Sequence, residues 1–164
     1  MQINLLTENM QIWLSKSIQS ELYASSLYKS LANQNERQGF FGAQKFYLKE
    51  SADELTHYQK LADFANSMGW CAPIPAIEAV TEVVYSIGTA LQISFETELA
   101  LLRQYQEFYK AAEEEDCITA QFLLQFMEIQ RLAVGEYMDL RTRYQRCGMN
   151  EAAILEFDEY MGEK

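Results

Sequence analysis

The chain has 164 residues, which is long enough for one domain with a sizeable hydrophobic core and too short for two. Its net charge is −11, which disfavours a nucleic-acid partner and an anionic membrane surface, because both normally require a basic patch. Hydrophobic residues make up 49% of the chain, with only seven glycines and two prolines, a composition that favours long helices.

Apolar residues recur at helical spacing along nearly the whole chain. The pattern predicts helices over residues 4–32 and 40–68, the second of which ends before Gly69. Residues 69–75 contain Pro73 and Pro75 and are predicted to be non-helical, because proline fixes φ and lacks an N–H donor. Three further helices are predicted over residues 86–112, 118–146 and 151–161, the first with Ser86 as its N-cap.

The connection over residues 69–85 is far longer than the roughly two to eight residues that usually join bundle helices. It is long enough to travel the length of a bundle, so the helices on either side of it can run parallel. We therefore predict an all-α fold over residues 1–164 as a single domain: a four-helix bundle with one long crossover and a short fifth helix. An up-and-down bundle with an irregular loop is the alternative.

Three glutamates and one histidine lie on the apolar faces of the first three predicted helices: Glu21, Glu54, His57 and Glu98. Glu21 continues the stripe of Leu14 and Ile18, and the Glu54–His57 pair shares a face with Leu61, Ala65 and Met68. Glu98 is expected between Leu91, Phe95, Leu102, Tyr105 and Tyr109. Buried carboxylates are costly and repel one another, and a bound cation removes both difficulties.

We therefore predict that Glu21, Glu54, His57 and Glu98 form a metal site. Carboxylate oxygens with one imidazole suit iron or another first-row metal better than magnesium or calcium. Taken singly, each residue also has a structural explanation, since a helical glutamate is usually solvated and Glu-x-x-His pairs arise by chance. Tyr28, two turns after Glu21, is either a core tyrosine or a hydrogen-bond donor or redox-active phenol beside the metal.

These residues resemble the ferritin family, nearest the non-haem bacterial ferritins. Residues 21–28 resemble the family's first-helix motif, residues 50–57 its second-helix iron motif, and residues 121–123 the entry to its fourth helix. The resemblance covers nearly the whole chain and implies a ferritin-like bundle that self-associates into a hollow 24-mer shell. It also implies that Fe(II) is oxidised by O2 or peroxide at a di-iron ferroxidase centre and stored as ferric mineral.

Carried over residue by residue, the resemblance implies that Glu21, Glu54 and His57 bind a first iron. Glu54 would bridge to a second iron that Glu98 also binds, and Gln130 matches a glutamine beside the centre. The implied iron ligands are therefore Glu21, Glu54, His57, Glu98 and Gln130, and the implied catalytic residues are Glu54, Tyr28 and Gln130.

The predicted fourth helix departs from the family pattern. Ile129, Leu132 and Ala133 stand where acidic ligands are expected, and Asp53 replaces a glutamate of a third site. Helical geometry directs Glu128 and Glu136 away from the face that carries Gln130. The resemblance thus implies a slow ferroxidase with a weakened second position and no third. The alternative is a non-catalytic structural subunit whose partner chain oxidises the iron.

Several rival readings are disfavoured. His57 is the only histidine, whereas symmetric di-iron carboxylate proteins, among them bacterioferritins and rubrerythrin-like proteins, use two Glu-x-x-His motifs. No haem is expected, because Ser51, Ala52 and Leu55 occupy the region where a methionine ligand would stand. Three widely spaced cysteines, no visible signal peptide and no long apolar run indicate a cytoplasmic protein with no membrane partner.

An acidic run follows the third predicted helix: Glu113, Glu114, Glu115 and Asp116. It is predicted to form an interhelical loop, and in position it resembles the loop near the three-fold channels of ferritins. Two interpretations stay open: the run attracts Fe(II) towards the shell, or it is an ordinary solvated loop.

Overall fold

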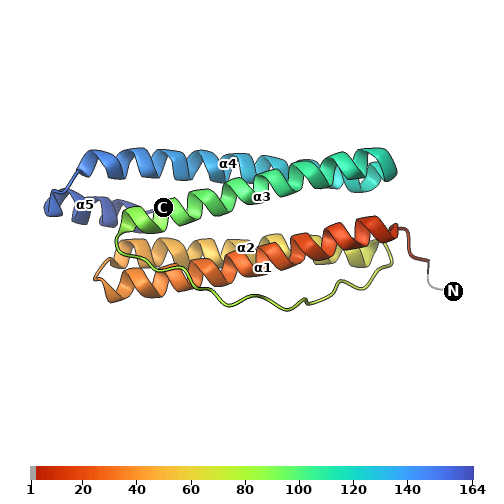
Figure 1. The fold of residues 1–164 in the computed structure, drawn as a ribbon, viewed down its shortest axis with the longest axis horizontal. Helices are drawn as coiled ribbons and strands as arrows, with labels where there is room; N and C mark the ends of the chain where they lie inside the picture. The colour runs from red at the N-terminus through yellow and green to blue at the C-terminus, as the bar shows by residue number, and fades with distance from the viewer. Residues whose placement is uncertain (1–2) are drawn as a thin grey trace.

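The computed structural model describes residues 3–164, and these residues form five helices and no strand (Figure 1). The long helices are α1 (Glu8–Arg37), α2 (Phe41–Ser67), α3 (Ile87–Glu115) and α4 (Cys117–Cys147), and the short α5 (Glu151–Gly162) follows them. α1 packs along α2 and α3 packs along α4, so the bundle consists of two helix pairs. The predicted all-α bundle with a short fifth helix is confirmed. Among residues 3–164, no helix is both long and apolar enough to span a membrane.

The long connection between α2 and α3 runs the length of the bundle beside α1, so that α2 and α3 point in the same direction, as predicted (Figure 1). Side chains of α1 hold it in place. The Gln34 amide donates to the Glu82 carbonyl (2.9 Å) and accepts from the Val84 N–H (2.8 Å). The Tyr23 hydroxyl donates to the Glu82 carboxylate (2.9 Å). The crossover is therefore fixed by specific contacts rather than left as a loose loop.

The ends of α1 differ from the sequence prediction. The helix begins at Glu8 rather than near residue 4, because the Thr7 hydroxyl accepts from the Met10 N–H and caps it there. It continues past residue 32 to Arg37, through a polar stretch that reads as a loop in the sequence. Within that stretch Asn35 is buried and donates to the Leu31 carbonyl (2.8 Å), so a polar residue takes a core position.

The acidic run is helical up to Glu115, so the prediction of an interhelical loop is wrong for all but Asp116. Asp116 alone separates α3 from α4, and its carboxylate accepts from the N–H groups of Ile118 and Thr119 as the N-cap of α4. Glu115 accepts from Thr7 and Asn9 (2.8 and 2.6 Å), which ties the end of α3 to the start of α1. Acidic residues oppose the dipole at a helix C-terminus, and these two contacts offset that cost.

The core consists of two hydrophobic clusters, one towards each end of the bundle. On α1, Leu14 and Ile18 belong to one cluster and Leu27 and Leu31 to the other, with Glu21 between them. The three other helices also place a buried polar side chain between the two clusters: Glu54, Glu98 and Gln130. We call these four residues the polar layer.

The short α5 closes one end of the bundle against α2. The buried Asp158 carboxylate accepts from the N–H groups of Gly42 (3.0 Å) and Ala43 (2.7 Å). It thereby caps the N-terminus of α2. The N-cap residue itself, Phe40, cannot do this because its side chain has no hydrogen-bond acceptor. The contact is so close that a Cβ on Gly42 would lie 1.8 Å from the Asp158 carbonyl oxygen.

Candidate metal centre

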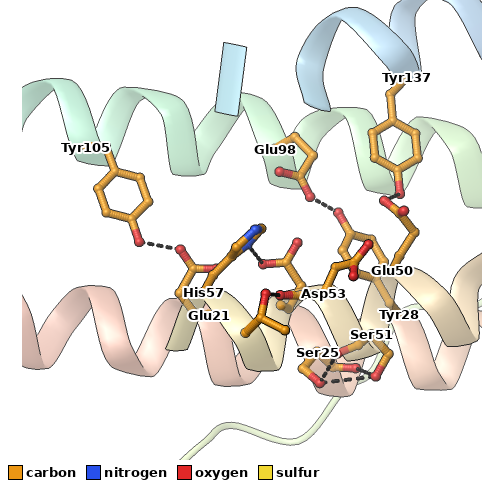
Figure 2. A network of polar contacts seen from close by, with 12 residues as sticks. Glu21, Ser25, Tyr28, Glu50, Ser51, Asp53, His57, Glu98, Tyr105 and Tyr137 are labelled. Carbon is orange, nitrogen blue, oxygen red and sulfur yellow. Dashed lines mark hydrogen bonds and ion pairs between the residues drawn. The ribbon is translucent and has the colours of Figure 1, made fainter. Parts of the chain in front are cut away.

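Two residues of the polar layer, Glu21 and Glu54, lie beside His57, so that α1 and α2 together offer three potential metal ligands (Figure 2). Ligand atoms of Glu21, Glu54 and His57 lie within 4.8 Å of one another. The His57 Nδ1 is 3.1 Å from Glu54 Oε2 and 3.7 Å from Glu21 Oε2. Both carboxylates are buried and the imidazole is half-buried. Two carboxylates and one imidazole at this spacing can bind a single first-row metal ion.

Glu98 approaches the same region from α3 and is 1% exposed. Tyr28 on α1 donates its hydroxyl hydrogen to Glu98 Oε1, and Tyr105 on α3 donates likewise to Glu21 Oε1 (Figure 2). Within the described chain, the second oxygen of each carboxylate, Oε2, has no hydrogen-bond donor. A buried oxygen without a donor costs free energy, and a bound cation would remove that cost.

Gln130 lies on α4 and is fully buried. Neither its amide nitrogen nor its amide oxygen has a hydrogen-bond partner among residues 3–164. Buried polar groups are nearly always partnered in folded proteins, so an amide with two free atoms points to a ligand from outside the chain. The role of Gln130 beside the ions stays a prediction.

No carboxylate of α4 reaches the polar layer in the part of the chain that the structure describes. Glu128 is exposed and pairs with Arg131 (2.7 Å), and Glu136 pairs with Lys164 (2.6 Å), so both point away from the site as expected. Ile129 and Ala133 are half-buried and Leu132 is exposed. The fourth side of the site is therefore supplied by an amide and apolar side chains.

Burial changes the proton affinity of the carboxylates. It raises the pKa of Glu98 to about 8, an effect that the hydrogen bond from Tyr28 partly opposes. The pKa of Glu54 lies well above its usual range, first because of burial and then because Glu21 and Glu98 are negatively charged neighbours. Burial likewise raises the pKa of Glu50 to about 7. In the absence of a cation, these groups hold protons that a metal ion would displace.

Three polar side chains near the site were not assigned a site role from the sequence: Glu50, Tyr105 and Tyr137. Tyr105 was expected only as an apolar neighbour of Glu98, but its hydroxyl reaches Glu21. Glu50 lies one turn before Glu54 on α2 and accepts from the Tyr137 hydroxyl (2.9 Å). The spacing of four residues between Glu50 and Glu54 was the available signal, because it places both on one helix face.

The face of α3 that was expected around Glu98 is only partly buried. Leu91 and Tyr105 are buried, whereas Phe95, Leu102 and Tyr109 are half-buried. The buried face of α3 also contains Ser94, Leu101 and Phe108 beside Glu98. Asp53, which stands where the family pattern has a third-site glutamate, is exposed.

A family model described as a ferritin-like domain matches residues 13–142. The chain is 32% identical over 159 residues to a probable bacterial non-heme ferritin-like protein of Haemophilus influenzae, with 96% of each chain covered. It is 27% identical over 164 residues to a bacterial non-heme ferritin of Bacteroides fragilis, which covers 98% of this chain and 100% of that one. Among solved structures, an open pore ferritin of Archaeoglobus fulgidus matches with a TM-score of 0.94 at 24% identity, over 97% of this chain and 98% of that chain.

Proposed function

We propose that this chain, which belongs to the ferritin family, binds Fe(II), oxidises it slowly and stores the product as ferric mineral. The observation that carries this proposal is the compact group of Glu21, Glu54 and His57. Further support comes from polar atoms of Glu21, Glu98 and Gln130 that are buried without a hydrogen-bond partner among residues 3–164. Iron is here the substrate and the cargo.

In the proposed reaction Glu21, Glu54 and His57 bind the first Fe(II), and Glu98 supports a second ion that Glu54 also contacts. Each Fe(II) loses one electron to O2, which takes up two protons and leaves as hydrogen peroxide, while two Fe(III) ions remain for the mineral. Anionic oxygen ligands favour the higher charge of Fe(III) and thereby lower its reduction potential. The Tyr28 hydroxyl orients Glu98, and the Gln130 amide offers a further polar contact to the ions.

The oxidation is proposed to be slow because α4 supplies no carboxylate to the second ion. The same feature favours a second candidate function, a structural subunit that builds the shell while a partner chain oxidises the iron. The first function is preferred, because a purely structural subunit has no need for three buried carboxylates whose charges repel one another.

Self-association into a hollow shell of the 24-mer type is part of the proposal. Apolar side chains of the crossover support it, since Ile74, Val83 and Tyr85 are exposed on the isolated chain. Three free cysteines fit a reducing compartment, which supports a cytoplasmic location.

The proposal is tested by adding Fe(II) and air to the purified apoprotein and following ferric absorbance together with O2 consumption. Wild-type protein should oxidise iron faster than protein-free buffer, and Glu54→Ala should remove the fast phase, because it deletes a ligand shared by both ions. Asp63→Asn, an exposed change on the same helix, should keep it. Wild-type rates equal to those of buffer would exclude the ferroxidase and leave the structural subunit.

A further inference from the structure

We propose that Glu50 is an additional ligand of the iron site, and that with Glu54 and Glu98 it forms the second ion position. α2 and α3 would then supply the carboxylates that α4 lacks. This inference rests on the proposed function and deepens it, because it identifies the residues that hold the second ion.

Glu50 lies on the same face of α2 as Glu54. It precedes Glu54 by four residues, so the two side chains lie on consecutive turns of one helix face, with Cβ atoms about 6 Å apart. Glu54 is buried and Glu50 half-buried, which places Glu50 on the side of the polar layer that approaches the surface. An ion between these two turns would contact one oxygen of each carboxylate.

Two stacked tyrosines link Glu50 and Glu98, because each ring donates a hydrogen bond to one of the two carboxylates. The rings of Tyr28 and Tyr137 have centroids 6.3 Å apart and an interplanar angle of 23°. Tyr28 donates to Glu98, and Tyr137 donates to Glu50 (2.9 Å). Figure 2 shows the Tyr28 hydroxyl between the two carboxylates. Without an ion, the phenol hydroxyls separate two groups that would otherwise repel each other.

Buried polar atoms on α3 and α4 lack hydrogen-bond partners among the described residues, which is an observation independent of Glu50. Glu98 extends from α3 towards α2 (Figure 2), and its Oε2 is buried without a donor in the described structure. The Gln130 amide is fully buried, and both of its polar atoms lack a partner among residues 3–164. These atoms belong to α3 and α4, so the need for an external ligand does not arise from the acidic residues of α2 alone.

The donor set fits an iron ion. Three carboxylates supply the hard anionic oxygens that Fe(II) and Fe(III) accept, and Glu54 can contact both ions at once. Tyr137 acts as a positioning residue, because it bonds Glu50 and has no need to touch the ion. The apolar Ile129 and Ala133 on α4 are tolerated under this arrangement, because α2 and α3 supply the negative charge.

The test is an anaerobic titration of the assembled apoprotein with Co2+, a redox-stable probe, followed by calorimetry and visible absorption. Excess Mg2+ suppresses weak surface binding. We expect two tight ions per chain in the wild type and one in Glu50→Gln, with the second affinity lowered about ten-fold or more. The glutamine keeps an oxygen that accepts from Tyr137, so the variant retains the surrounding packing.

Two control variants distinguish the loss of a metal ligand from a general change of charge or packing. Asp63→Asn makes the same change of charge at an exposed site on α2 and should still bind two ions. Tyr137→Phe removes the donor that positions Glu50 but keeps the carboxylate, so it should lower the affinity for the second ion less than Glu50→Gln does. A loss of the second ion in Tyr137→Phe as large as in Glu50→Gln would assign the effect to packing and overturn the role of Glu50 as a ligand.

The remaining outcomes distinguish this inference from the proposed function. Equal binding of two ions by the wild type and Glu50→Gln would overturn the inference alone. One tight ion in the wild type would also overturn it, while leaving the position of Glu21, Glu54 and His57 occupied. A wild type that binds no Co2+ tightly would contradict the proposed function itself.

Discussion

At the scale of single residues, the buried carboxylates make the stability of the apoprotein depend on pH. Glu98 and Glu50 have pKa values of about 8 and about 7 in the folded chain, and that of Glu54 is also raised. An unfolded glutamate releases its proton near pH 4.3, so between that value and about pH 8 the native state binds more protons than the unfolded one. The free energy of unfolding must therefore fall as the pH rises through this window.

We predict this fall for metal-free protein measured by urea unfolding in the presence of a chelator between about pH 5 and pH 8. Glu98→Gln should reduce the slope, because it removes one of the groups that holds a proton in the folded state. Glu96→Gln changes an exposed glutamate on the same helix and should leave the slope unchanged. Stability that is constant or rises over this range would contradict the raised pKa values.

The Tyr28 hydroxyl is predicted to matter through Glu98. Its hydrogen bond lowers the pKa of that carboxyl, so Tyr28→Phe should raise the pKa further and weaken Co2+ or Fe(II) binding. Loss of the donor should also lower the free energy of unfolding by about 1–3 kcal/mol. Tyr47→Phe is the matched control, because the Tyr47 hydroxyl accepts from Ser94 (3.1 Å) and forms no hydrogen bond to a carboxylate among residues 3–164. Equal metal affinities in the two variants would argue against a role for Tyr28 at the site.

Residue spacing predicts part of the site and misses the remainder for a physical reason. Glu21, Glu54 and His57 each interrupt an apolar stripe of their own helix, and periodicity alone reveals such interruptions. The Tyr137–Glu50 bond joins residues 87 positions apart, and the Tyr105–Glu21 bond joins residues 84 apart. Such contacts depend on the relative register of different helices, which the pattern of a single helix does not determine. The ligand roles of all these residues remain predictions.

At the scale of elements, the sequence predicts the order and direction of the helices, but it predicts the residues at which they end less accurately. The two prolines and the length of the connection over residues 69–85 predict the crossover, and the structure confirms it. The sequence pattern does not predict the last turns of α1 and α3, because these turns are polar and carry no apolar period. Those turns are held by side-chain bonds from Asn35 and to Glu115.

The close contact between α2 and α5 is expected to contribute to the stability of the protein. Gly42→Ala should destabilise the protein, because the new Cβ would meet the Asp158 carbonyl oxygen at 1.8 Å and push α5 away from the N-terminus of α2. Gly135→Ala is a matched control on α4, where an added Cβ meets nothing within 4 Å, and it should be neutral or stabilising by up to about 1 kcal/mol. Thermal unfolding of the two variants checks this, and equal melting temperatures would contradict the tight docking of α5.

At the scale of the whole molecule, the crossover allows side chains from both helix pairs to meet at one site inside the bundle. Because it returns the chain to the starting end of α2, α2 and α3 run parallel (Figure 1). The buried Glu54 and Glu98 therefore come from opposite helix pairs. The two hydrophobic clusters on either side of the polar layer provide the apolar burial that offsets the cost of the charged groups.

The outer face of the same crossover carries exposed apolar side chains, which we expect to be covered when chains assemble. Ile74, Val83 and Tyr85 are 69%, 55% and 79% exposed, and covering such side chains is worth roughly 1.5–3 kcal/mol each. We expect light scattering after size exclusion to give a particle many times heavier than the 19.0 kDa chain. The double variant Val83→Asp and Tyr85→Asp should shift it to smaller species with unchanged helical circular dichroism. Thr81→Asp adds charge at an exposed crossover position without removing apolar surface, and should assemble normally. A wild type that stays a stable monomer would contradict the shell.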